Sequence, residues 1–216
     1  MPRLGLGRNL SIPRRAGGLL VGAQYFNGTT TRVSLANAVS LQDFTVMCWI
    51  KTDFAATARL FDARDAIGDG IVISDHSSTL FRFNYNSVIM SATKTNAVWT
   101  HFAATANATT DIGTIFINGV SGGTGSIAGT DISTTTAAKI GCRNFSNGEF
   151  YKGNLAQMAV FNTALSGAQI TAIMNKTYSQ LTAGEKTGLI SWWSLTNIGG
   201  TSVPDLHGTN TGTLTP

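Results

Sequence analysis

Four aspartates between residues 62 and 75 form the densest group of metal-binding side chains in the sequence; they are Asp62, Asp65, Asp69 and Asp75. Calcium takes six to eight oxygen ligands, which loop carboxylates and carbonyls can supply. We therefore treat Asp62, Asp65 and Asp69 as candidate calcium ligands, although their spacing matches no EF-hand loop. Arg59 and Arg64 stand beside these acids, so ordinary ion pairing explains the run at least as well. We expect no other cofactor.

Patterns typical of catalytic residues are missing from the sequence. Glycoside hydrolysis needs two carboxylates, about 5–5.5 Å or 6.5–9.5 Å apart. The two glutamates, Glu149 and Glu185, fall in expected loops or turns, and no expected strand carries two acids two residues apart. His101 lies in the strand-like run WTHFA, where we predict a structural imidazole. The sequence has no G-x-S-x-G elbow and no phosphate-binding loop, so we expect no enzymatic activity.

Aromatic residues beside amide and charged side chains give two candidate groups for sugar binding. A sugar site needs an exposed aromatic platform and a few polar donors. One group is Tyr85 with Asn84 and Asn86, and the other is Phe145 or Tyr151 with Arg143, Asn144 and Asn147. The alternative for both groups is an aromatic ring packed on a sheet beside ordinary polar turn residues.

The beginning of the chain carries its entire net charge. Residues 1–18 contain no acid and four arginines, namely Arg3, Arg8, Arg14 and Arg15. The chain has 15 Lys and Arg against 11 acidic residues, so these arginines account for the whole net charge of +4. We predict a basic arm over residues 1–21 and one domain over residues 22–216. Four charges without interleaved aromatics are too few for a nucleic-acid binder, so we expect the arm to dock on a neighbouring subunit.

The stretch Tyr151 to Asn175, YKGNLAQMAVFNTALSGAQITAIMN, is typical of a strand, a turn and a short helix. Ser166 and Gln169 have the spacing of a capping box, which marks the start of the helix. Strict alternation predicts a strand covered on both sides. One face would hold Leu155, Gln157, Ala159 and Phe161, and the other Ala156, Met158 and Val160.

Short alternating runs between turn signals fill the rest of the chain. FTVMCWIKT, residues 44–52, is the clearest, and we predict a half-buried strand there. WTHFAATA and GTIFINGV, residues 99–106 and 113–120, predict a hairpin pair, and the turn dipeptide Asn118-Gly119 closes the second of these strands. Asn27-Gly28 predicts a further turn between two short strands. About a dozen short strands with one helix predict an all-β antiparallel sandwich.

Composition agrees with a folded domain that does not span a membrane. Charged residues make up 12% of the chain and hydrophobic ones 43%. No apolar run approaches the ~20 residues that a spanning helix needs, and the run Leu19 to Ala23 is too short for a signal peptide. Cys48 and Cys142 lie in strand-like runs, and we predict two buried small hydrophobic side chains rather than a disulfide.

Six pieces of the sequence, taken together and in order, resemble one family. They are YFNGTTTRVSL, FTVMCWIKT, VWTHFAATANATTDIGTIFINGV, AAKIGCRN, YKGNLAQMAVFNTALSGAQITAIMN and GLISWWSL…VPDLHGTNTGTL. Over roughly residues 22–214 the chain resembles the laminin-G-like domains of the concanavalin A-like superfamily. This resemblance implies an antiparallel jelly-roll β-sandwich with one short helix, and a lectin-like face that binds glycans.

The resemblance also implies a calcium site in many members, within a strand of the pattern Gly-x-Ile-Asp-Glu. The corresponding run here is Gly153-Asn154-Leu155-Ala156-Gln157, which has lost both carboxylates. The run therefore lacks the two acidic ligands that the family pattern supplies for calcium at this place.

The basic arm and the sparsely charged sandwich resemble those of bacteriophage virion proteins. This resemblance, which no single motif carries, gives our functional hypothesis of a non-enzymatic virion structural protein. It would be a capsid decoration, fibre or tail-associated subunit that is assembled in the host cytoplasm. The arm would dock on other virion proteins, the copies would form a homo-oligomer, and the sandwich would display a face for cell-surface glycans. We expect neither membrane nor nucleic acid as a partner. The alternative is a stand-alone carbohydrate-binding module.

Overall fold

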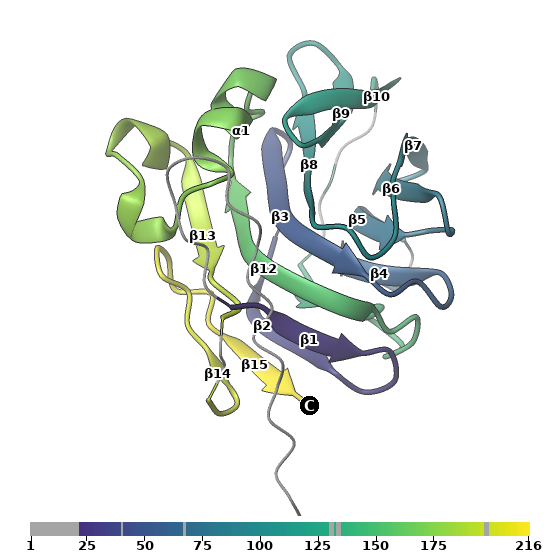
Figure 1. Cartoon of the computed structure of the whole chain (residues 1–216). Helices are drawn as coiled ribbons and strands as arrows, with labels where there is room; N and C mark the ends of the chain where they lie inside the picture. Colours follow the sequence, from purple (N-terminus) through teal and green to yellow (C-terminus); the bar gives the residue numbers. More distant parts are fainter. Residues whose placement is uncertain (1–21, 40, 67, 130–131, 133–134, 197–198) are drawn as a thin grey trace, which may run out of the picture.

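Two antiparallel β-sheets packed face to face form the fold in a computed structural model of the chain (Figure 1). The structure describes residues 22–39, 41–66, 68–129, 132, 135–196 and 199–216. The predicted basic arm, with Arg3, Arg8, Arg14 and Arg15, lies outside the described residues. The predicted all-β antiparallel sandwich is confirmed.

The two sheets draw their strands from both halves of the chain. Sheet A runs in the order β1-β12-β3-β8-β9-β10, with β13 paired to β12. Its strands are β1 (Gln24–Asn27), β3 (Phe44–Thr52), β8 (Thr100–Asn107), β9 (Ile112–Ile117), β10 (Val120–Ser126), β12 (Lys152–Phe161) and β13 (Leu189–Trp193). Sheet B runs in the order β14-β15-β2-β11-β4-β5-β6-β7. Its strands are β2 (Arg32–Ala38), β4 (Ala58–Arg64), β5 (Gly70–Asp75), β6 (Leu80–Tyr85), β7 (Val88–Thr93), β11 (Ala137–Ile140), β14 (Ser202–Val203) and β15 (Gly212–Thr215).

Three short helices follow β12: α1 (Gly167–Ile173), η1 (Tyr178–Gln180) and η2 (Gly184–Lys186). The capping box at the start of α1 is confirmed, because Ser166 Oγ accepts from the Gln169 backbone N–H at 3.3 Å and Gln169 Oε1 accepts from the Ser166 N–H at 2.9 Å. Within the part of the chain that the structure describes, no helix has the length and apolar character needed to cross a membrane.

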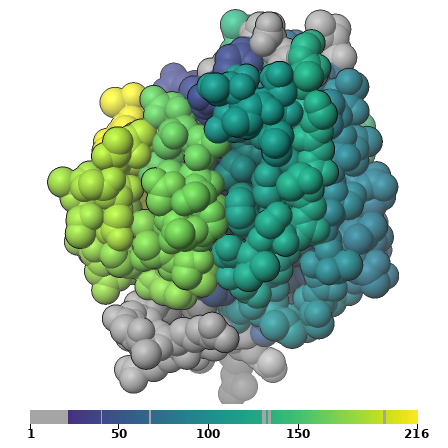
Figure 2. All heavy atoms as spheres, turned by 90° about the horizontal axis from the view of Figure 1, so that it is seen from above, coloured from purple at the N-terminus to yellow at the C-terminus, as the bar shows by residue number. Residues whose placement is uncertain are grey.

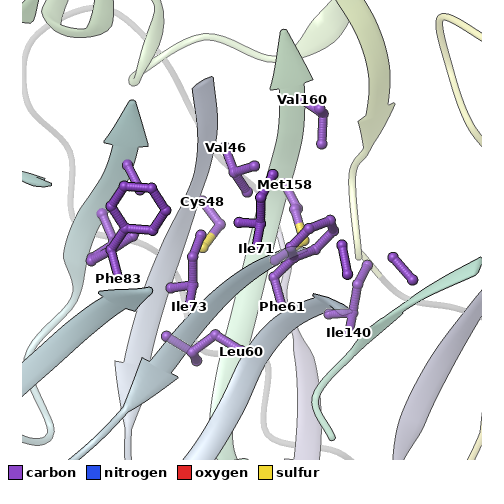
Figure 3. Packing of buried hydrophobic residues seen from close by; sticks show 14 of the residues in the cluster. Val46, Cys48, Leu60, Phe61, Ile71, Ile73, Phe83, Ile140, Met158 and Val160 are labelled. Carbon is purple, nitrogen blue, oxygen red and sulfur yellow. The ribbon is translucent and has the colours of Figure 1, made fainter. Parts of the chain in front are cut away.

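The main hydrophobic core lies between the sheets (Figure 3). Val46 and Cys48 of β3 contribute to it from sheet A, and Phe61 of β4 and Ile73 of β5 from sheet B, all fully buried. Period-two alternation brings these side chains to the inner faces of their sheets. Cys48 and Cys142 are both buried and free, as predicted.

The outer face of sheet A is covered as well, so the prediction of a half-buried strand at 44–52 is wrong. Met47 and Trp49 point away from the main core, yet they are only 1% and 8% exposed. Met47 packs with Ile170 and Ile173 of α1, and Trp49 donates its indole N–H to the Met174 carbonyl at 2.6 Å. Figure 2 shows this green helical segment lying against the teal residues of β8 to β10.

A bulge in β12 changes the faces that alternation predicts. The register with β3 shifts between Ala156 and Ala159, and Gln157 has a φ of 52°. The two residues before the bulge therefore swap their predicted faces. Leu155, Met158 and Val160 join the main core, while Ala156, Ala159 and Phe161 lie on the outer face of sheet A.

The two predicted turns have different outcomes. Asn118 and Gly119, with φ of 52° and 81°, connect β9 to β10, and β8 pairs with β9 as predicted. Asn27 and Gly28 also turn the chain, but β1 pairs with β12 in sheet A and β2 with β11 and β15 in sheet B. The turn at Asn27-Gly28 is therefore a corner between the sheets and not a hairpin.

Candidate functional site

The outer face of sheet B carries a row of polar side chains, in contrast to the helix-covered face of sheet A. Arg59 of β4 pairs in register with Ser74 of β5, Ser74 with Arg82 of β6, and Arg82 with Ser91 of β7. Residues opposite one another on neighbouring strands point to the same face of a sheet. We call Arg59, Ser74, Arg82 and Ser91 the polar row.

Buried polar atoms without a protein partner gather along this row. Ser74 Oγ, Arg82 Nε and Asn84 Oδ1 are all buried and make no hydrogen bond within the described residues. Ser74 is only 1% exposed. An unpaired buried polar atom costs about 1–3 kcal/mol, so native proteins pair nearly all of them with protein, solvent or ligand. The row is thus a surface with unused hydrogen-bonding capacity.

A network of ion pairs holds the loop of residues 143–149 beside the row. Glu149 contacts Arg59 Nε at 2.5 Å and also pairs with Arg143. Asp62, which is fully buried, pairs with Arg64 at 3.2 Å and with Arg59 at 3.9 Å. Three arginines thus share two carboxylates, and the loop is tied to β4 through Glu149.

Three further hydrogen bonds fix the same loop. Lys139 Nζ donates to the Asn144 carbonyl and to Asn147 Oδ1, each at 2.6 Å. Asn144 Nδ2 donates to the Arg64 carbonyl at 2.8 Å. The loop therefore presents Phe145, which is 48% exposed, from a well-anchored backbone. The Arg143 guanidinium lies over the Phe145 ring at 5.7 Å, a cation–π arrangement.

Positive charges converge where the loop meets the polar row. Burial and the neighbouring Arg64, opposed by Asp62, lower the pKa of Arg59 to about 10. The pKa of His76 is lowered mainly by burial, and further by the positive charges of Arg82 and then Arg59. Burial is the largest cause of both shifts, and neighbouring arginines add to it. Cations held close together on a partly buried surface favour a negatively charged or strongly hydrogen-bonding ligand.

Two aromatic residues of the predicted sugar groups lie in the core. Tyr85 is fully buried, and its ring stacks on Phe44 with 5.9 Å between centroids. Tyr151 is fully buried against Phe26 at 6.0 Å. Tyr85 is one of the inward-facing residues of β6, and Tyr151 directly precedes β12. The two rings cannot serve as exposed platforms, and Phe145 remains as the exposed ring of these groups.

The polar members of the predicted groups divide into scaffold and surface. Asn86 Oδ1 accepts from the Gly70 N–H at 2.6 Å, which fixes the end of β6. Asn144 and Asn147 anchor the loop as described. Arg143 lies at the exposed ring, and Asn84 lies on the outer face next to the polar row. The structure therefore unites Asn84 and Arg143 with one face of sheet B.

The three candidate calcium ligands are not brought together. The Asp62 carboxylate is occupied by Arg59 and Arg64, as the ion-pairing alternative predicted. Asp65 Oδ1 accepts from the Asp69 N–H at 2.9 Å within the turn between β4 and β5. Among the described residues, no group of three or more His, Cys, Asp or Glu side chains is placed to hold a metal.

A concave surface elsewhere offers a weaker case for ligand binding. It has a volume of about 440 Å³ and is lined by neutral side chains that include Gln157, Tyr178, Ser194 and Thr196. Lys186 Nζ lies 4.2 Å from the centre of the Tyr178 ring, and the ring also contacts Trp192 and His207. This ring is engaged by the protein itself, so the Phe145 loop and the polar row form the better candidate.

Five residues of this candidate site were not singled out from the sequence as binding residues: Arg59, Ser74, Arg82, Ser91 and Glu149. Along β6, Leu80, Arg82 and Asn84 alternate with three buried aromatic residues, which puts Arg82 on the outer face. The pairing of Arg82 with Ser74 and Arg59 depends on strand order and register, which a local pattern does not reveal.

The chain folds into an all-β sandwich of two antiparallel sheets. One outer face is covered by helices and the other is polar, and this architecture defines a lectin-like jelly-roll protein. The chain belongs to the concanavalin A-like lectin/glucanases superfamily, whose family model matches residues 27–171. The family resemblance noted in the sequence is thereby confirmed. No curated protein sequence matches the chain significantly.

Solved structures agree on the fold. A protein from Bacteroides ovatus, provisionally assigned to carbohydrate binding, has a TM-score of 0.73 at 16% identity, covering 90% of this chain and 58% of its own. A SAP-like pentraxin from Limulus polyphemus has a TM-score of 0.56 at 17% identity, covering 69% of this chain and 80% of its own. The CBM40 module of a Ruminococcus gnavus sialidase, bound to α2,3-sialyllactose, has a TM-score of 0.54 at 15% identity, covering 62% and 84%. The chain thus spans 58% of the length of the B. ovatus protein.

Proposed function

We propose that this chain is a non-catalytic carbohydrate-binding domain whose ligand lies on the outer face of sheet B. The observation that carries the proposal is Phe145, an exposed ring held by an anchored loop beside a row of unused polar groups. Sugar rings stack their apolar faces on such rings while polar side chains bind their hydroxyls. The similarity in fold to the R. gnavus module that binds sialyllactose supports the same class of ligand.

The carboxylates of this face argue for binding rather than hydrolysis. Glu149 is paired with Arg59 and Arg143, and Asp62 is paired with Arg64. A glycosidase needs two carboxyl groups that are free to act on either side of the scissile bond. Both of these carboxylates are instead engaged by arginine side chains, an arrangement that favours binding over hydrolysis.

Binding to a panel of immobilised glycans tests the proposal. Full-length protein should bind at least one oligosaccharide, and Phe145→Ala should weaken that binding about tenfold or more, in line with the loss of one stacked ring. Val120→Ala is the matched control, because Val120 is 71% exposed on β10 of the other sheet. Equal binding by both variants, or no binding to any glycan, would contradict the proposal.

We propose further that the domain is displayed on a bacteriophage virion as a homo-oligomer docked through residues 1–18. Support comes from the sequence alone: four arginines without an acid, in front of a sandwich with few charges. Sedimentation of full-length protein against a chain starting at Gly18 tests it, with Arg14 and Arg15 changed to Ala as a milder variant. If assembly is lost while the domain stays folded, docking through the arm is supported. If assembly is unchanged, the docking proposal is rejected.

A further inference from the structure

The polar row has the layout of a binding place for a negative charge. Arg59 and Arg82 lie on the two strands that flank β5, each in register with Ser74. Neighbouring strands are about 4.8 Å apart, so one arginine stands on either side of Ser74 on the same face of the sheet. We propose that the saccharide bound on this face is acidic and that its anionic group lies over Ser74 between Arg59 and Arg82. This inference rests on the proposed carbohydrate-binding function.

The unpaired atoms match such a group chemically. A guanidinium has five N–H donors and no acceptor, and a serine hydroxyl can donate one hydrogen bond. Arg82 Nε and Ser74 Oγ, both buried and unpaired within the described residues, can therefore donate to carboxylate or sulfate oxygens. Asn84 Oδ1 is an acceptor, and a sugar hydroxyl beside the anionic group would satisfy it. Hydrogen bonds to a charged oxygen are about twice as strong as neutral ones.

The charge balance of the face points the same way. Asp62 and Glu149 are already shared among Arg59, Arg64 and Arg143. Arg82 adds a further positive charge that takes part in no ion pair among the described residues. An anionic group over Ser74 offsets the repulsion between Arg59 and its neighbours. A neutral sugar would cover Arg82 without supplying a counter-charge, which is unfavourable for a desolvated cation.

Isothermal titration of the full chain tests the inference with three oligosaccharides of equal length: an oligogalacturonate, a sulfated galactan and a neutral galactan. The carboxylated or the sulfated sugar should bind at least tenfold more tightly than the neutral one. Raising the salt concentration should reduce this advantage, since screening weakens interactions between exposed charges. Whichever acidic sugar binds more tightly identifies the anionic group.

Charge removal at one position provides the decisive comparison. Arg82→Gln, which keeps most of the aliphatic stem, should abolish the preference, bringing the variant's affinity for the acidic sugar to within about twofold of its own affinity for the neutral sugar. Lys152→Ala removes one charge from the exposed start of β12 in sheet A and should keep the preference. If the neutral and acidic sugars bind equally, the inference is overturned but the proposed function stands. If no sugar binds, both are overturned. Tighter binding of an oligonucleotide than of every sugar, lost in Arg82→Gln, also overturns it.

Discussion

Trp192 donates its indole N–H to the side-chain oxygen of Gln157 at 2.8 Å, across the pair of strands β12 and β13. Both residues are nearly inaccessible, with exposures of 1% and 5%. The Gln157 backbone N–H donates to the Ser194 carbonyl at 2.9 Å. The bulge at Gln157 is thus fixed from two sides, which accounts for a non-glycine residue at a φ of 52°.

Removing either partner should destabilise the domain. Gln157→Ala leaves the buried Trp192 N–H unpaired, and we expect the free energy of unfolding to fall by about 1–3 kcal/mol. Trp192→Phe leaves the amide oxygen unpaired and also loses ring volume. The double variant should cost less than the sum of the single ones. Urea unfolding of the four proteins measures this coupling, and strictly additive losses would show that the hydrogen bond contributes nothing.

The same bulge marks where sequence patterns stop being sufficient. Strand β12, the capping box at Ser166 and the turn at Asn118-Gly119 follow from local chemistry, and all three are confirmed. Gln157 has no intrinsic preference for positive φ, so nothing local announces the extra residue. The burial of Tyr85 and the alignment of Arg82 with Ser74 and Arg59 depend on which strands become neighbours. Local patterns therefore predicted the elements, while the membership of the candidate site followed from register.

The buried ring of His101 should make stability depend on pH. Burial lowers the pKa of His101 to about 3, and its ring meets the edge of Trp49 at 5.3 Å. The position is buried as a structural imidazole requires, although Nδ1 has no partner within the described residues. The unfolded chain binds a proton near pH 6.5 and the folded one does not. Stability should thus fall as pH drops from about 6.5 toward 3, with a slope approaching 1.4 kcal/mol per unit.

Denaturant unfolding at several pH values between 7.5 and 4 measures this slope. His101→Gln should flatten it, whereas the control His207→Gln, at an exposed position, should leave it in place. A slope that is the same in His101→Gln and in the wild-type protein would refute the assignment to His101.

Asp205 ties the C-terminal segment to β13 and should act at lower pH. Its Oδ1 accepts from the backbone N–H groups of Trp192, His207 and Gly208, each at 3.0 Å. Burial of the carboxyl raises its pKa, but these hydrogen bonds outweigh burial, and the net pKa is lowered. Because the pKa of Asp205 is lower in the folded protein than in the unfolded chain, the ionised carboxylate stabilises the fold at pH values above its unfolded pKa. This contribution is lost as pH falls below about 4.

Asp205→Ala should therefore lower the free energy of unfolding by about 1–3 kcal/mol at pH 7. The difference from wild-type protein should shrink as pH falls toward 3, because the wild-type carboxylate is then protonated. Asp53→Ala is the control, at an exposed position in the loop after β3. A difference that stays constant over this pH range would show that the charge of Asp205 is not what stabilises the segment.

Glu149 should determine how firmly the Phe145 loop is held. Its carboxylate joins Arg59 of β4 to Arg143 of the loop. Glu149→Gln keeps the size of the side chain but removes the charge, and charge-assisted hydrogen bonds weaken about twofold when one partner becomes neutral. We expect faster backbone hydrogen exchange in residues 143–149, with Lys139 still holding the Asn144 carbonyl. Glu185→Gln, which disrupts the pair with Lys176, should leave that exchange unchanged.

The loop should also link Glu149 to sugar binding. Phe145 contributes to affinity only while its ring is held in place, so Phe145→Ala should weaken binding far less in the Glu149→Gln background than in the wild-type protein. Titration of one bound oligosaccharide into the four proteins measures this coupling. The loss of a carboxylate near the polar row makes the face more positive, and it should strengthen binding of an acidic sugar in the Phe145→Ala background. Independent effects of the two substitutions would mean that the ring is positioned by the Lys139 and Asn144 hydrogen bonds alone.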